Sequence, residues 1–159
     1  MDITIASNNA SFEFDNYRLY CRLIEGRYPN YRSVIPKAND KFAVADTDSM
    51  ISALKRTSVF TDQNTMAIKL SFQDKLHIQV QNIDYSTSAE ESLDLDSYKG
   101  TPIEMGFNGT YLIEVLSNIP SEKVCFSMKE THLATILTPV EENIGSKLLY
   151  IIMPISINF

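Results

Sequence analysis

From residue 42 onward the same order of hydrophobic patterns occurs twice, and this repetition constrains the fold more than any other feature. Each copy predicts a short strand, a helix and then three strands in which apolar and polar residues alternate. The first copy runs from a strand at 42–45 through a helix over 48–60 to strands at 66–72, 75–80 and one ending near residue 95. The second runs from a strand at 103–107 through a helix to strands at 124–128, 133–137 and 147–153. Hairpin-linked strands with one helix per copy favour antiparallel sheets with helices packed on one side, an α+β fold.

The helix of the second copy has the clearest boundaries. Asn108 is a suitable N-cap, and Phe107 before it can pack onto Leu112 in the first turn. Pro120 ends the helix. The apolar residues recur at positions that share one helical face: Tyr111, Leu112, Val115, Leu116 and Ile119.

The segment before the repeat also predicts strands. Alternating residues at 2–6, 11–14 and 17–23 are separated by turns rich in Asn and Asp, which is typical of hairpins. A loop containing Gly26 and Pro29 follows, and residues 37–41 form a polar linker.

Composition narrows the class of protein. The chain has 159 residues, of which 44% are hydrophobic and 21% charged, as in globular proteins. No apolar run reaches the roughly 18 residues of a membrane helix, and the N-terminus, Met-Asp-Ile-Thr, has no basic stretch followed by an apolar one, as a signal peptide would. We therefore expect a cytoplasmic protein with reduced Cys21 and Cys125. The net charge of −6 argues against nucleic acid binding unless the positive charge gathers on one face.

Signals for catalysis are weak. His77 and His132 have no cysteine or second histidine at metal-ligand spacing, and the chain has only five glycines and no phosphate-binding loop. The acidic stretch at 90–96 is interpreted as a solvated loop and strand edge, although a small hydrolase built on it is an alternative without a supporting motif. We therefore expect no enzyme activity, no metal and no cofactor.

Three segments each resemble a segment of one known protein family. Residues 23–36, Leu-Ile-Glu-Gly-Arg-Tyr-Pro-Asn-Tyr-Arg-Ser-Val-Ile-Pro, are similar to the family's connector between its second and third domains. Residues 104–108, Glu-Met-Gly-Phe-Asn, with Tyr-Leu at 111–112 and Val-Leu at 115–116, resemble a second family segment. Residues 150–154, Tyr-Ile-Ile-Met-Pro, resemble the C-terminal ending. Their order and spacing agree over essentially the whole chain, which therefore resembles the bacterial sliding clamp family, the beta subunits of DNA polymerase III.

The resemblance implies the DNA clamp fold, in which each domain is a duplicated strand–helix–three-strand unit with two helices. Three domains form a crescent, and two crescents close into a ring with helices lining the hole. Residues 39–159 would be the third, C-terminal domain, and residues 1–38 the last strands of domain 2 plus the connector. The first domain and most of the second would be absent, so Met1 would not be the natural start. The native ring is a homodimer, which we do not expect this chain to form.

The implied function is that of a non-catalytic processivity factor in DNA replication. The ring encircles double-stranded DNA without sequence specificity. It tethers the DNA polymerase III catalytic subunit, the clamp loader, and repair and translesion polymerases through a short Gln-Leu-x-Leu-Phe-like motif. No membrane partner is implied. The rival hypothesis is an isolated peptide-binding module unrelated to DNA.

The resemblance also implies a partner-peptide pocket. The alternative is that residues 151–153 form a buried last strand and that Pro29 is only a turn residue. Ser33 stands where the family often has arginine, and the ending at 155–159 differs from the usual one, which leaves the peptide preference open. The pocket residues carried over are Pro29, Val34, Asn108, Tyr111, Ile151, Ile152, Met153 and Pro154.

Two further surfaces are expected on the first helix. Arg56 falls opposite its apolar face and Lys55 on the flank, so both are DNA-facing candidates, against the alternative of an ordinary solvated face. The second helix has Glu114 and no lysine or arginine on its polar side. Val59 and Phe60 would lie at the ring-closing dimer interface, unless they fold under the following loop.

Overall fold

The computed structural model describes residues 1–141 and 147–157. It divides into two compact units, Met1–Arg32 and Ser33–Phe159, which are described separately. The sequence-based boundary after residue 38 concerns clamp domains and stays a prediction.

The N-terminal unit is an antiparallel sheet in the order β1 (Asp2–Ile5), β2 (Asn9–Phe14) and β3 (Tyr17–Arg22). Its register places Ile3 opposite Phe12, and Phe12 opposite Leu19, so apolar side chains line one face. Ile3 is 51% exposed and Leu19 52% exposed. The three predicted strands are confirmed, but they bury almost nothing.

The larger unit follows a 3-10 turn, η1 (Tyr31–Ser33), and contains the predicted duplication. The α+β fold class is therefore confirmed. One additional short strand, β8 (Ser97–Lys99), pairs with the first strand of the repeat and was not predicted. The first copy is β4 (Lys41–Asp46), α1 (Thr47–Ser58), β5 (Ala67–Phe72), β6 (Lys75–Asn82) and β7 (Thr87–Asp94). The second is β9 (Ile103–Asn108), α2 (Gly109–Ser117), β10 (Lys123–Met128), β11 (Thr135–Pro139) and β12 (Tyr150–Ile152).

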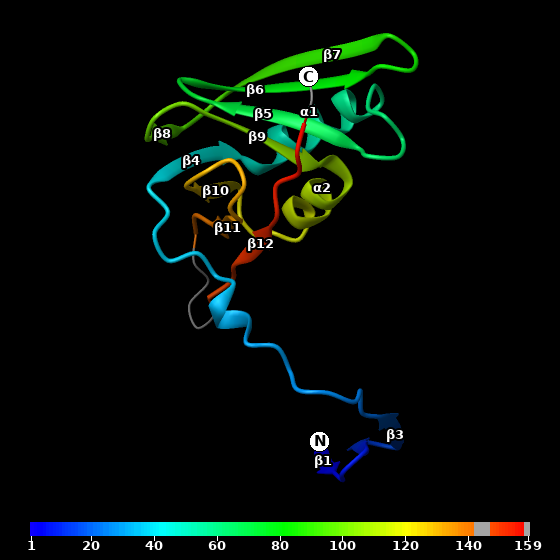
Figure 1. Cartoon of the computed structure of the whole chain (residues 1–159). Helices are drawn as coiled ribbons and strands as arrows, with labels where there is room; N and C mark the ends of the chain where they lie inside the picture. Colours follow the sequence, from blue (N-terminus) through cyan, green and yellow to red (C-terminus); the bar gives the residue numbers. More distant parts are fainter. Residues whose placement is uncertain (142–146, 158–159) are drawn as a thin grey trace. The chain divides into compact units, whose positions relative to one another are not determined.

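The two copies exchange their first strands. One sheet has the order β12-β11-β10-β4-β8 and the other β7-β6-β5-β9. Each sheet thus contains the three consecutive strands of one copy and the leading strand of the other (Figure 1). Every pairing within them is antiparallel.

The two copies also form equivalent hydrogen bonds at the starts of their helices. The N-cap Asp46 of α1 accepts a hydrogen bond from the N–H of Ser49 at 2.8 Å, and the N-cap Asn108 of α2 accepts one from Tyr111 at 3.2 Å. The first helical residues then donate to the residue before the neighbouring strand, Thr47 to the carbonyl of Glu122 and Gly109 to that of Met66, both at 2.8 Å. Because the caps are satisfied in the same way, the duplication is structural and not only a pattern of hydropathy.

The core of the larger unit lies where the helices cover the sheets. α1 packs against β6, β7 and α2, and it buries Met50, Ala53 and Leu54 completely. Phe72 of β5 and Phe126 of β10 meet with their ring centroids 5.4 Å apart, which joins the two sheets. None of the helices within residues 1–141 and 147–157 is long and apolar enough to cross a membrane.

The segment after β12 ties the sheets together a second time. The N–H of Ile155 donates to the carbonyl of Gly106 in β9 at 2.8 Å. A Cβ atom at Gly106 would lie 2.4 Å from Cγ2 of Ile157 and 2.6 Å from the carbonyl oxygen of Ile155. Only glycine leaves room for this close approach.

Candidate functional site

A mostly apolar groove lies between the segment after η1 and the turn that joins β10 to β11. Its volume is about 400 Å³, and Met153 closes it from the segment after β12. Val34 is 62% exposed and Met153 61% exposed, so both side chains are available for contact. The groove is lined by residues 33–39, Lys129, His132, Leu133, Ala134 and Met153.

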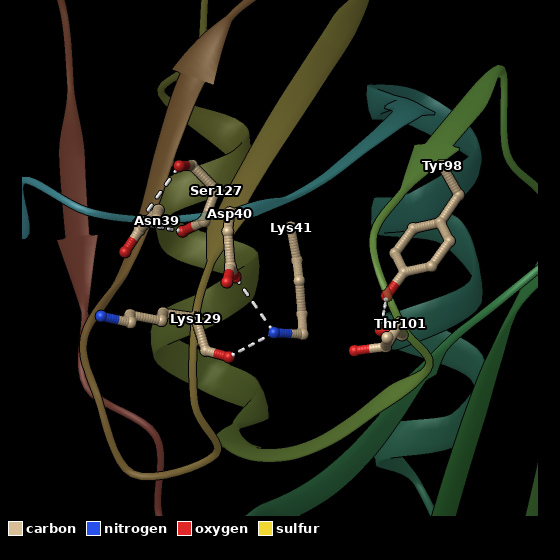
Figure 2. A network of polar contacts seen from close by, with 7 residues as sticks. All are labelled: Asn39, Asp40, Lys41, Tyr98, Thr101, Ser127 and Lys129. Atoms are coloured by element: carbon tan, nitrogen blue, oxygen red, sulfur yellow. Dashed lines mark hydrogen bonds and ion pairs between the residues drawn. The ribbon is translucent and has the colours of Figure 1, made fainter.

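A network of hydrogen bonds holds the two walls of this groove together (Figure 2). The Asn39 side-chain N–H donates to the carbonyl of Ser127 at 2.8 Å and to its hydroxyl at 3.1 Å. The Lys41 ammonium donates to the carbonyl of Lys129 at 2.8 Å and pairs with Asp40 at 3.0 Å. Asn39, at the end of the first wall, is thereby fixed to the end of β10, immediately before the residues that form the opposite wall.

The turn between β8 and β9 lies beside Asp40 and Lys41 of the same network. The Tyr98 hydroxyl donates to the carbonyl of Thr101 at 2.6 Å. Burial, and then the negative charge of Asp40, raises the pKa of Tyr98. The hydrogen bond from Lys41 holds the pKa of Asp40 below its usual value. Gly100 has φ +131° and lies against the Lys41 side chain, so a larger residue would be strained there.

The structure brings Val34 and Met153 together in the groove, as the resemblance implied, and places the other pocket candidates around them differently. Ile152 is buried in β12 opposite Thr135, and Ile151 pairs with Ile136, so the alternative of a structural last strand describes these two residues well. Pro154 is half-buried. Pro29 belongs to the N-terminal unit, and its role stays a prediction.

Asn108 and Tyr111 form a separate pair at the start of α2. Besides capping the helix, the Asn108 side-chain N–H donates to the carbonyl of Thr65 at 3.2 Å. Tyr111 is 63% exposed. A structural role accounts for Asn108, whereas the exposed Tyr111 ring is free to contact a partner.

Of the residues that line the groove, sequence reasoning named only Val34 and Met153 as pocket candidates. It missed the neighbours of Val34 within 33–39 and the whole opposite wall: Lys129, His132, Leu133 and Ala134. The alternation suggested a strand over 133–137, but β11 begins at Thr135. This shift leaves Leu133 and Ala134 in the turn, where their side chains form a wall. No local pattern distinguishes an apolar turn residue that lines a groove from the first residue of a strand.

The outer surface of α1 is less basic than the sequence suggested. The Arg56 guanidinium pairs with both carboxylate oxygens of Glu91 on β7. Lys55 is exposed and has no ion pair within the described part of the chain. Lys55 is therefore the stronger of the two DNA-facing candidates.

The end of α1 presents two apolar side chains to solvent. Val59, the C-cap residue, is 77% exposed, and Phe60 is 41% exposed. They do not fold under the following loop to the extent that the alternative required. Arg56, less than one turn before Val59 on α1, pairs with Glu91 on β7, and β7 is the outer strand of its sheet, so it has one unpaired edge.

The two histidines have ordinary surroundings. His77 Nδ1 lies 2.8 Å from the Ser92 hydroxyl, and His132 Nε2 lies 3.7 Å from a Glu130 carboxylate oxygen. Over residues 1–141 and 147–157 no group of His, Cys, Asp and Glu side chains is arranged to hold a metal ion.

The chain is similar to several bacterial sliding clamps. It is 31% identical to the beta sliding clamp of Pseudomonas putida over 134 residues, which is 84% of this chain and 35% of the relative. It is 26% identical to that of Vibrio cholerae over 153 residues, 96% of this chain and 41% of the relative. The chain thus spans about two fifths of the length of these relatives.

Solved structures of sliding clamps are also similar to this chain. A DNA polymerase sliding clamp from Pseudomonas aeruginosa with ligand matches 98% of this chain with a TM-score of 0.90 and 26% identity, over 41% of its own length. A sliding clamp of the same organism bound to griselimycin matches 98% with a TM-score of 0.89. The family model of the DNA polymerase III beta subunit, C-terminal domain, matches residues 32–156, and the chain therefore belongs to that family.

Proposed function

We propose that this chain is the C-terminal part of a ring-shaped sliding clamp, a non-catalytic processivity factor that encircles duplex DNA and tethers its partners through the groove. The observation that carries the proposal is the exposed pair Val34 and Met153 in an apolar groove, within a chain of the clamp family. The activity follows from topology, because a closed ring cannot leave DNA without opening.

The groove suits the short Gln-Leu-x-Leu-Phe-like peptide that the family resemblance implies. Its apolar walls would take the Leu and Phe anchors, and the flexible Met153 side chain would adapt to different partners. A polymerase or clamp loader bound there would be held near the DNA at a high effective concentration. Tyr111 would contact the same peptide from α2.

The outer surface of α1 would face the DNA. Lys55 supplies an exposed positive charge, while Arg56 is partly neutralised by Glu91. Few phosphate contacts and no base contacts are what a protein that slides along DNA requires. The overall charge of −6 fits this picture, because it limits tight binding to the backbone.

The ring-closing interface would include Val59, Phe60 and the free edge of β7. Exposed apolar side chains next to an unpaired strand edge are typical of a surface that another subunit covers. The complementary surface would belong to the first domain of a second subunit.

Peptide binding is tested by fluorescence anisotropy with a labelled Gln-Leu-x-Leu-Phe peptide. We expect saturable binding that Met153→Ala and Val34→Ala each weaken about tenfold, as truncation of a central contact does. Ile83→Ala is the matched control, because Ile83 is an exposed aliphatic residue that does not line the groove. Binding that both groove variants leave unchanged would place the peptide elsewhere.

Absence of binding calls for a second titration, with the chain extended upstream to the length of its relatives. If the extended protein also fails to bind the peptide, the assignment of the groove is refuted.

Encirclement separates the clamp from an isolated peptide-binding module. The extended protein, loaded onto circular DNA, should stay bound at high salt and dissociate once the circle is cut. Equal retention on circular and linear DNA would contradict the ring.

A further inference from the structure

The turn between β10 and β11 forms one wall of the groove, and it lies beyond the end of the strand pairing that supports it. The pairing of β4 with β10 ends where Lys41 lies opposite Met128, and β11 begins only at Thr135. Inside the turn the N–H of Leu133 donates to the carbonyl of Glu130 at 3.1 Å. This bond shapes the turn but does not attach it to the rest of the unit. The position of the wall therefore depends on contacts outside the paired strands.

One such contact is the hydrogen bond from the side chain of Lys41 to the backbone of Lys129 (Figure 2). The ammonium reaches past the last strand pair and donates to the Lys129 carbonyl at 2.8 Å. Lys129 is the first residue after β10 and lines the groove, whereas Lys41 does not line it. Hydrogen bonds from a charged donor are stronger than those from a neutral one. Lys41 thus fixes the first residue of the wall without occupying the binding surface.

The Lys41 side chain is itself held at both ends. It is only 15% exposed, and its ammonium pairs with Asp40 at 3.0 Å. The stem lies against Gly100 in the turn between β8 and β9, since a Cβ atom at Gly100 would be 2.6 Å from Cγ of Lys41. Because the stem is packed and the charged end is paired, the side chain has already lost most of its conformational freedom in the unbound protein.

We propose that Lys41 is a positioning residue of the groove, which contacts no peptide but holds the β10–β11 turn in the conformation that binds one. The inference rests on the proposed function, since the groove is the same, but it concerns the rigidity of a wall and not the sequence that binds. Without the bond to Lys129, the turn that carries Leu133 and Ala134 would have to become ordered when a peptide arrives. Ordering at the moment of binding lowers affinity.

The test replaces Lys41 with methionine, which keeps an unbranched stem against Gly100 and removes the N–H donors. Binding of the labelled Gln-Leu-x-Leu-Phe peptide should weaken about fivefold in fluorescence anisotropy, since ordering one or two side chains on binding costs about that much. In the peptide-free protein, amide hydrogen exchange should accelerate about tenfold across residues 129–134, while β5 and β6 exchange as in the wild type.

Lys99→Met is the matched control. Lys99 lies opposite Phe42 on the strand next to β4, is exposed and does not line the groove, so this variant removes the same charge and leaves the bond to Lys129 intact. It should change the peptide Kd and the exchange of residues 129–134 less than about twofold. Lys41→Gln, whose side chain is shorter and uncharged, is the second variant if methionine at this position impairs folding.

The results separate a positioning role from general stabilisation and from the proposed function. Unchanged exchange across residues 129–134 would show that the turn holds its own conformation, and unchanged peptide affinity would show that binding does not depend on its rigidity. Either result overturns the inference. Faster exchange throughout the larger unit also overturns it, because Lys41 would then only stabilise the fold. If the wild type binds no peptide even when extended upstream, the proposed function fails, whereas the exchange measurement still decides whether Lys41 holds the turn.

Discussion

At the scale of single residues, the N-caps of the two helices depend on both local preference and tertiary contacts. The side chain of Asn108 caps α2, and the side chain of Asp46 caps α1, which begins at Thr47. Asp46 and Asp48 are both of a capping type, and local preference does not choose between them. The choice is made by tertiary contacts, since the N–H of Thr47 donates to Glu122 only when β4 and β10 are paired.

Asp46 makes stability depend on pH. Hydrogen bonds from the side chain and then the backbone of Ser49 lower its pKa in the folded protein. Its contribution is therefore fully present above the ordinary aspartate pKa, near 3.9, and is lost as the pH falls through the lowered native value. Asp46→Ala should cost about 1 kcal/mol at pH 7 in urea unfolding, whereas Asp46→Asn should cost little because asparagine caps equally well. Between pH 5 and pH 2 the wild type should lose stability relative to Asp46→Asn, and parallel acid profiles would refute this.

The site shows the same division between local and tertiary information. Val34 and Met153 were named from a resemblance of short segments, and the structure brings them together. Lys129, His132 and Leu133 were not identified, because they enter the groove only through the β10–β11 turn and the bonds from Asn39 and Lys41. Ile152 was expected in the pocket but packs in the core, since alternation along β12 turns its side chain inward.

At the scale of elements, types were more predictable than partners. Hydropathy periods identified the longer strands and both helices, because each period follows from local geometry. They could not reveal that β4 pairs with β10 or that β9 pairs with β5, since these contacts join distant parts of the chain. β8 was missed because its three residues have no pattern of their own and depend on the edge of β4. β12 is shorter than the predicted 147–153, and Leu148 and Leu149 remain outside it and exposed.

The close contact between the C-terminal segment and β9 can be tested by substituting alanine for Gly106, which adds a single methyl group. Gly106→Ala should displace Ile155 and Ile157, because the new Cβ would collide with a backbone oxygen as well as a side chain. We expect a loss of about 1–3 kcal/mol in the free energy of unfolding, as for other overpacked sites. Thermal or urea unfolding measures it. Gly26→Ala is a control for inserting a methyl group, since nothing lies within 4 Å of the added Cβ and its cost is that of the positive φ alone. Equal, small losses in both variants would contradict the close packing.

At the scale of the whole molecule, the two units differ in how much they bury. The larger unit encloses a continuous core, whereas Ala10 is the only buried hydrophobic residue described within Met1–Arg32. Alternation correctly predicted the three strands β1–β3, and their register places apolar side chains on one face of the sheet. The alternation contains no information on what covers that face.

Amide hydrogen exchange should separate the units. We expect fast exchange throughout β1–β3 in a monomer, because a small sheet without a covered face is marginally stable. Amides of β5, β6 and β10 should exchange orders of magnitude more slowly, since these strands are central in their sheets and lie over the core. Mass spectrometry of peptic fragments gives the comparison. Strong protection across residues 1–25 at a concentration where the protein is monomeric would show that the small sheet is stable by itself.

Because β4 and β9 each complete the sheet of the other copy, the two copies depend on each other for folding. A break in the backbone near Gly100 would leave two pieces, each holding a strand that completes the other's sheet. Neither piece could satisfy its backbone hydrogen bonds alone, so the pieces should recover the native fold only when mixed. A duplicated half of this kind cannot be deleted, replaced or recombined separately. Once the first strands had been exchanged, the two copies could diverge in sequence, but neither copy could fold without the other.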